Sequence, residues 1–88
     1  MIFTDGVHLI SDESLDELHA FAAAIGLKRV WFQTRPPGRH HYDLTTKRTV
    51  RRAIEAGARM VTIQEFVAAL RRAPQYQVWK TKRGIPTC

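Results

Sequence analysis

The order of apolar and polar positions predicts short strands that alternate with helices. Apolar runs at residues 2–4 and 7–10 indicate strand structure, and the Asp5-Gly6 pair between them is typical of either a hairpin turn or a bulge in one strand. Residues 29–33 alternate apolar Val30 and Phe32 with other side chains, which predicts a strand with two different faces. Residues 59–63 are a further predicted strand, and residues 76–79 could add an edge strand.

Three helices are predicted between these strands. Ser14 with Glu17 and Thr62 with Glu65 have the spacing of capping boxes at the starts of the first and last helices. Thr45 or Asp43 is expected to cap the middle helix. The predicted ends are Gly26, Gly57 and the residue before Pro74. The expected buried stripes are Leu15, Leu18, Phe21, Ala22 and Ile25; then Val50, Ala53, Ile54 and Gly57; then Phe66, Val67, Ala69 and Leu70.

The element order β-α-β-α-β-α predicts an α/β fold with right-handed crossovers. We expect a small single domain at residues 1–74, in which helices pack on a mostly parallel sheet. Residues 75–88 form a basic C-terminal extension that contains the edge strand. Ligands of such sheets bind beyond the carboxyl ends of the strands, which places a site among residues 11–12, 33–43 and 62.

Composition and charge narrow the classes of function. The 88-residue chain has no apolar run near the roughly 18 residues of a membrane helix and no signal-peptide pattern, so we expect a cytoplasmic protein without membrane contact. Its single cysteine, Cys88, cannot form an internal disulfide. Residues 1–27 contain five acids and no Lys or Arg, whereas the rest contains fourteen basic residues and three acids. Two faces of opposite sign would suit an anionic ligand, nucleic acid or a homo-oligomer.

The segment GRHHYDLTTKR at residues 38–48 is the candidate site. A helix N-terminus attracts anions, and the basic residues in its first turn carry an electrostatic cost that a bound phosphate would offset. The expected ligand-binding residues are His41, Tyr42, Asp43, Lys47 and Arg48, with His8 and Trp31 as neighbours. Each also has a structural interpretation: Asp43 as a cap, Tyr42 as a packed ring, His8 as a buried histidine, Trp31 as part of the core, and Lys47 and Arg48 as a solvated face. His19 is also expected to be structural.

Other site chemistry has weaker support in the pattern. Neither HxxxH nor CxxC occurs, so spacing predicts no metal site, and His8, Asp12, His41 and Asp43 could converge only through the fold. A nucleophile turn and a Gly-rich phosphate loop are also missing from the sequence. The basic second half, with Trp79 and the KTKR run, offers charge and a stacking ring for nucleic acid without a known binding motif.

The ordered segments VHLIS, DELHAFAAAIGL, WFQ, HYDLTTKR and AGARMVT resemble a bacterial and phage family known as domain of unknown function 4031. The resemblance runs over residues 2–63 and implies no activity. It directs attention to the residues at matching positions: His8, His19, Trp31, Gln33, His41, Tyr42, Asp43, Lys47 and Arg48. It is also compatible with a phage or bacterial accessory protein.

The leading expectation is a protein that binds a small phosphate-bearing ligand, most plausibly a nucleotide. One alternative is a phosphoester hydrolase in which His41 and Asp43 are catalytic, with or without a divalent metal. Another is a nucleic-acid or protein interaction module that uses the basic second half. The sequence leaves open whether the protein is an enzyme and which cofactor, if any, it uses.

Overall fold

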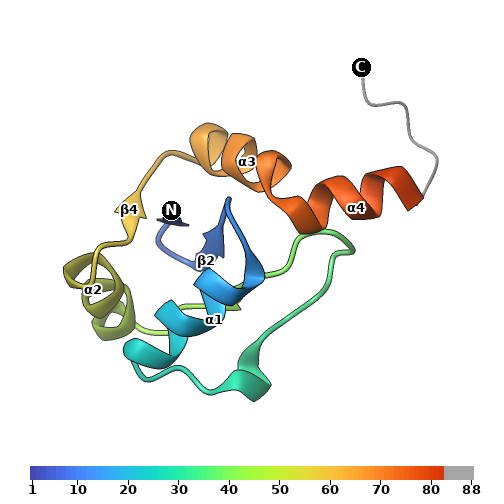
Figure 1. Ribbon diagram of the computed structural model, residues 1–88. Coiled ribbons are helices and arrows are strands. Elements are labelled where there is room, and N and C mark those ends of the chain that lie inside the picture. The colour runs from blue at the N-terminus through green and yellow to red at the C-terminus, as the bar shows by residue number, and fades with distance from the viewer. Residues whose placement is uncertain (83–88) are drawn as a thin grey trace.

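The computed structural model describes residues 1–82 as an α/β fold built on a four-stranded sheet (Figure 1). The strand order in the sheet is β3-β2-β1-β4. In chain order the elements are β1 (Ile2–Thr4), β2 (His8–Ser11), α1 (Leu15–Ala24), the 3₁₀ helix η1 (Arg29–Trp31), β3 (Tyr42–Asp43), α2 (Lys47–Glu55), β4 (Arg59–Met60), α3 (Ile63–Arg72) and α4 (Pro74–Lys82).

The first two strands form an antiparallel hairpin, which decides between the two interpretations of Asp5-Gly6. Thr4 pairs with Leu9 across the turn. The Asp5 carboxylate accepts hydrogen bonds from the backbone N–H groups of Val7 and His8, at 2.9 and 2.7 Å. Gly6 has φ +96°, a conformation that costs glycine little. The turn therefore fixes both the hairpin and the position of Asp5 beside His8.

The α/β class is confirmed, but the prediction of a mostly parallel sheet in β-α-β-α-β-α order is wrong. Only β1 and β4 pair in parallel, whereas β1–β2 and β2–β3 are antiparallel. The predicted strand at residues 29–33 is largely the 3₁₀ helix η1, in which Val30 is 84% exposed. The chain then returns through an antiparallel bridge between Gln33 and His41 into β3, a strand that the sequence pattern did not predict. Residues 29–32 have no strand beside them to pair with, so their alternating pattern produced no strand, and only Gln33 forms a bridge.

The edge strand predicted at residues 76–79 is also wrong, because these residues belong to helix α4. Proline suits the first turn of a helix, where its missing N–H has no intrahelical acceptor to serve, and Pro74 opens α4. α4 returns to the loop before β3, where a Cβ on Gly38 would lie 2.9 Å from the Trp79 ring. The remainder of the extension, residues 83–88 with Cys88, lies outside the described residues.

Helix boundaries follow the predicted signals closely. Ser14 and Thr62 cap α1 and α3, and Thr62 completes a capping box with Glu65. Glu17 instead contacts Ser11 Oγ. Helix α2 is capped by Thr46, not by Thr45 or Asp43. Gly26 and Gly57 follow the ends of α1 and α2 with positive φ, as predicted. The stripes are confirmed in part: most positions are buried, Leu15, Phe21 and Val50 are partly buried, and Ile54, Gly57 and Val67 are exposed.

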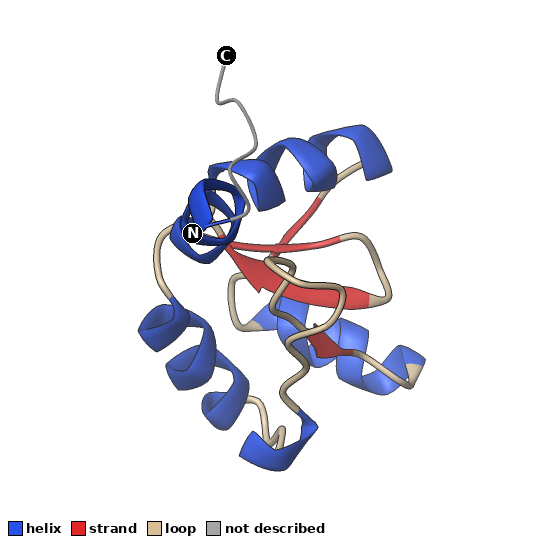
Figure 2. Cartoon of the chain, turned by 90° about the vertical axis from the view of Figure 1, so that its right-hand side faces the viewer, coloured by secondary structure: helices blue, strands red, loops and turns tan. Residues whose placement is uncertain are grey.

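The sheet separates two hydrophobic clusters, with helices on both of its sides (Figure 2). Alternate strand residues face opposite clusters because successive side chains of a strand point to opposite faces. Leu9 packs with α1 and α2, while the next residue, Ile10, packs with α3. Of the helices within residues 1–82, none has the length and apolar content needed to cross a bilayer. The face that carries α3 also carries the polar cluster described next.

Candidate functional site

Three polar side chains meet on the α3 face of strands β2 and β3. His8 and Asp43 are direct partners in the antiparallel β2–β3 register. His41 lies two residues before Asp43, so its side chain emerges on the same face. His8 belongs to the start of β2 and Asp43 to the end of β3, and these ends coincide because the strands are antiparallel. The register of two short strands therefore assembles the His8–His41–Asp43 cluster.

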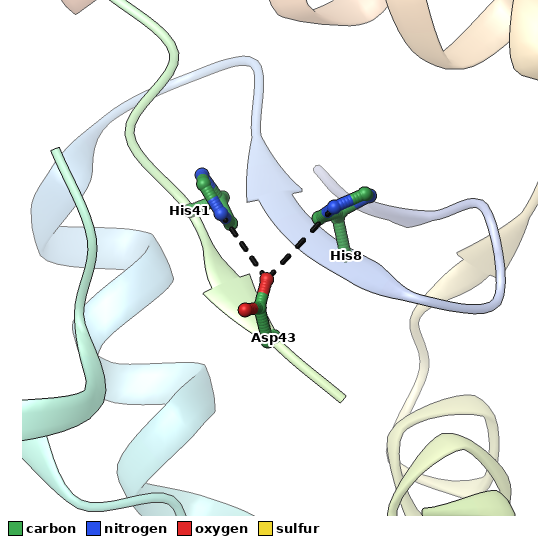
Figure 3. Close-up of side chains that lie close together, drawn as sticks. All are labelled: His8, His41 and Asp43. Atoms are coloured by element: carbon green, nitrogen blue, oxygen red, sulfur yellow. Dashed lines mark ion pairs between the residues drawn. The ribbon is translucent and has the colours of Figure 1, made fainter. Parts of the chain in front are cut away.

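Both imidazole rings point an Nε2 atom at the same oxygen of Asp43 (Figure 3). His41 Nε2 lies 3.1 Å from Asp43 Oδ1, and His8 Nε2 lies 3.9 Å from it. The two rings contact each other edge to face, with centroids 5.1 Å apart. The His8 side chain is 41% exposed and that of Asp43 38%, whereas that of His41 is only 11% exposed. The cluster is thus reachable from solvent on one side and packed on the other.

The opposite ring nitrogens are held by oxygen atoms. His8 Nδ1 lies 3.0 Å from Asp5 Oδ2, and His41 Nδ1 lies 2.7 Å from the backbone carbonyl oxygen of Arg39. Burial alone would raise the pKa of the Asp5 carboxyl. The hydrogen bonds it accepts from the His8 ring and from the backbone of His8 and Val7 outweigh burial and hold that pKa below its ordinary value. Asp5 is therefore an ionised acceptor that orients the His8 ring.

Cavities border the cluster, and two of them are lined by His41 or Asp43. The Arg39 cavity, of about 290 Å³, is lined by His8, His41 and Arg39 with the apolar side chains of Ile10, Phe66 and Leu70. The Trp31 cavity, of about 430 Å³, is lined by Asp43 and Gln33 together with Leu27, Val30, Trp31 and Thr49. Gln33 Nε2 donates a hydrogen bond of 2.6 Å to Asp43 Oδ2, which fixes the other oxygen of that carboxylate. Asp43 thus lines the Trp31 cavity and also contacts His41, which lines the Arg39 cavity.

The structure places the other residues of the sequence-based site in different environments. Tyr42 is 1% exposed and faces the α1 side of the sheet, where its hydroxyl lies 2.8 Å from His19 Nδ1. Burial raises the pKa of Tyr42, and burial together with the charge of Arg29 lowers the pKa of His19, so a neutral pair is favoured. Lys47 and Arg48 are exposed in the first turn of α2. Trp31 reaches the cluster only through the cavity that it shares with Asp43.

The sequence-based prediction missed two residues that contact the cluster, Asp5 and Arg39. Asp5 could have been found, because an Asp-Gly turn three residues before a histidine is an Asx-type arrangement that brings the carboxylate back onto the chain. Arg39 carried no distinguishing signal among fourteen basic residues. Asp12, which spacing grouped with the histidines, lies at the other end of β2, next to the Met1 ammonium and Arg72.

The cluster has the composition of a site for a single metal ion. His8, His41 and Asp43 each offer one ligand atom, and these atoms lie within 4.8 Å of one another. Two imidazoles and a carboxylate, with one side open, can hold a divalent ion or exchange a proton with a bound ligand. Nothing in the linear spacing indicated this arrangement, because His8 is more than thirty residues from its partners and reaches them only by strand pairing.

Comparison with known proteins gave one match, to a family model. No curated protein and no solved structure matched the chain. The family model, described as a protein of unknown function (DUF4031), matches residues 5–73. This range includes Asp5, the whole His8–His41–Asp43 cluster, the residues that line the Trp31 and Arg39 cavities, and α3. Because this match covers most of the chain and every element that builds the site, the protein belongs to the DUF4031 family.

Proposed function

We propose that this protein binds a nucleotide across the two cavities that border the cluster. The observation that carries the proposal is the position of Asp43, which lines the Trp31 cavity while its partners His8 and His41 line the Arg39 cavity. One environment offers a cation and two imidazoles, and the other offers an indole among aliphatic side chains. A ligand with an anionic group and a flat apolar group matches both.

The Arg39 cavity suits the phosphate. A guanidinium presents several N–H donors in a geometry that fits phosphate oxygens. The Arg39 side chain also makes a cation–π contact with α4, because its guanidinium carbon lies 5.8 Å from the centre of the Trp79 ring. The formal net charge of +6 attracts anions to the whole molecule before any specific contact forms.

The Trp31 cavity suits the base. Trp31 is 48% exposed, so its ring is accessible to a ligand, and Leu27 and Val30 line the same cavity. The Lys28 ammonium lies 5.6 Å from the centre of the Trp31 ring. Gln33, Thr45 and Thr49 supply donors and acceptors at the cavity wall for the polar edges of a base. Stacking on an indole contributes about 1–3 kcal/mol per base.

The test is a thermal-shift panel of nucleoside monophosphates, nucleosides and ribose 5-phosphate, each with and without a divalent cation. Nucleotides should raise the melting temperature most, since ligand at 100 times its Kd stabilises by about 2.7 kcal/mol. Arg39→Gln should reduce the shift by phosphate-bearing ligands, and Trp31→Ala should reduce the difference between a nucleotide and ribose 5-phosphate. The double variant Lys47→Ala/Arg48→Ala tests the first turn of α2 and should lower the shift as well. His40→Gln, which alters a ring stacked on Phe32, is the matched control.

A panel without any shift would contradict the proposal. Binding to DNA or RNA that falls with salt but survives Arg39→Gln and Trp31→Ala would instead assign the function to the exposed cations of α2. Hydrolysis of the bound phosphoester is the second function that we propose, because His41 lines the Arg39 cavity, Asp43 lines the Trp31 cavity, and the two side chains are 3.1 Å apart. Release of phosphate in the same samples, lost on His41→Ala and retained on His19→Gln, is its measurement.

A further inference from the structure

The hydrogen bonds around the two histidines decide which ring nitrogens are free. A carbonyl oxygen only accepts, so the contact with the Arg39 carbonyl places the ring hydrogen of a neutral His41 on Nδ1. The Asp5 carboxylate places it on Nδ1 of His8 in the same way. Both Nε2 atoms then carry lone pairs, and both lone pairs face Asp43 Oδ1. Three electron-rich atoms converge, and only a cation or an added proton between them makes that arrangement favourable.

We propose that His8 Nε2, His41 Nε2 and Asp43 Oδ1 bind one divalent transition-metal ion of the zinc class. Two imidazoles and a carboxylate are the protein ligands of many catalytic zinc sites. A histidine that binds such an ion usually donates its other ring N–H to a carboxylate or a backbone carbonyl, and here each histidine does one of these. Asp5 and the Arg39 carbonyl are therefore positioning groups for the ligands.

The three ligand atoms lie within 4.8 Å of one another, so the ion fits if the His8 ring moves toward it. Ligand atoms around a tetrahedral zinc ion, at about 2.0–2.2 Å from the metal, lie about 3.4 Å from one another. The 3.1 Å between His41 and Asp43 is close to that value, and the 3.9 Å between His8 and Asp43 exceeds it by a few tenths of an ångström. The His8 side chain is 41% exposed, so its ring is the less buried of the two imidazoles and the one with room to move toward the ion.

The fourth coordination position would open toward the Arg39 cavity, since His8 and His41 both line it. An ion there would also offset the negative charges of Asp5 and Asp43, which would otherwise repel a phosphate. This last step rests on the proposed nucleotide binding, whereas the metal site rests only on the cluster. Hard ions such as Mg²⁺ prefer oxygen ligands, so two imidazoles favour Zn²⁺ or Co²⁺.

The experiment is calorimetric titration of Zn²⁺ into the full chain after chelator treatment, in a Cys88→Ser background that removes the thiol. One equivalent should bind, and Co²⁺ should give the visible absorption of a tetrahedral site. His8→Gln, His41→Gln and Asp43→Asn should each abolish stoichiometric binding, while His19→Gln and His40→Gln should retain it. Asp5→Asn should keep one equivalent but weaken its affinity about 10–100-fold.

Failure of the native chain to bind Zn²⁺, or binding that survives both His8→Gln and Asp43→Asn, would overturn the site. His8→Gln removes a half-exposed ring, so it remains informative if His41→Gln does not fold, and circular dichroism verifies the fold of each variant. Nucleotide is absent from these titrations. A chain that binds Zn²⁺ but no nucleotide refutes the proposed function alone, and the reverse result refutes the metal site alone.

Discussion

At the scale of single residues, the four histidines of this chain have distinct roles that their neighbours determine. His8 and His41 share Asp43, His40 stacks on Phe32, and His19 contacts the Tyr42 hydroxyl from the other face of the sheet. The sequence-based interpretation of His19 as structural agrees with this contact. His8 was interpreted in the same way, but its side chain is 41% exposed and faces the same carboxylate as His41.

The surroundings of His19 should make the stability of the protein depend on pH. Burial first, and then the positive charge of Arg29, lowers the pKa of His19 from 6.5, with Asp16 opposing. Below pH 6.5 the unfolded chain therefore takes up a proton before the folded chain does, so the free energy of unfolding falls as pH decreases and is fully retained above pH 6.5. Urea unfolding between pH 7.5 and about 5.5 should show this loss, and His19→Gln should make it smaller. Identical pH slopes for both proteins would contradict the assignment.

At the scale of elements, local signals predict helices better than strands. The caps of α1 and α3 and the glycines after α1 and α2 depend on neighbouring residues and lie at the predicted positions, whereas the cap of α2 is Thr46 and not Thr45 or Asp43. β3 and β4 have only two residues each, too short for a period-2 pattern to appear. These strands exist because β1 and β2 offer them hydrogen-bonding partners.

The start of α2 provides a direct test at this scale. Thr46 Oγ1 accepts a hydrogen bond from the Thr49 backbone N–H at 3.1 Å, so Thr46→Ala should lower the free energy of unfolding by about 1 kcal/mol. Thr45→Ala, one residue earlier and also exposed, is the control and should change it by less than about 0.5 kcal/mol. Equal losses in chemical denaturation would show that the cap is not confined to Thr46.

At the scale of the whole molecule, one sheet connects two separate hydrophobic clusters. Ile2 belongs to the cluster under α1 and α2, and Ile10 to the cluster under α3. Neither strand can lose its packing on one face without loosening the other face, because β1 and β2 are hydrogen bonded along their length. We therefore expect the described part of the chain to unfold as one unit despite its two clusters.

Matched substitutions in the two clusters test this expectation. Ile2→Val and Ile10→Val should each lower the free energy of unfolding by about 0.5–1.5 kcal/mol, and Ile63→Val, at a position 71% exposed, should have a smaller effect. Circular dichroism and tryptophan fluorescence should give coincident denaturation curves for all three variants. Curves that separate in Ile10→Val alone would show that α3 and its cluster unfold independently.

The sequence by itself determined the α/β class, the positions of α1, α2 and α3 with the caps of α1 and α3, and the segment at residues 38–48 as a candidate that contains His41 and Asp43. These features arise from interactions between residues a few positions apart. Only the tertiary structure decided the direction of the strands, the helical conformation of residues 74–82 and the separation of Tyr42 from the polar cluster. It also brought Asp5, His8 and Arg39 next to residues 41–43. Strand pairing joins residues that are distant along the chain, and local sequence patterns do not show which strands will pair.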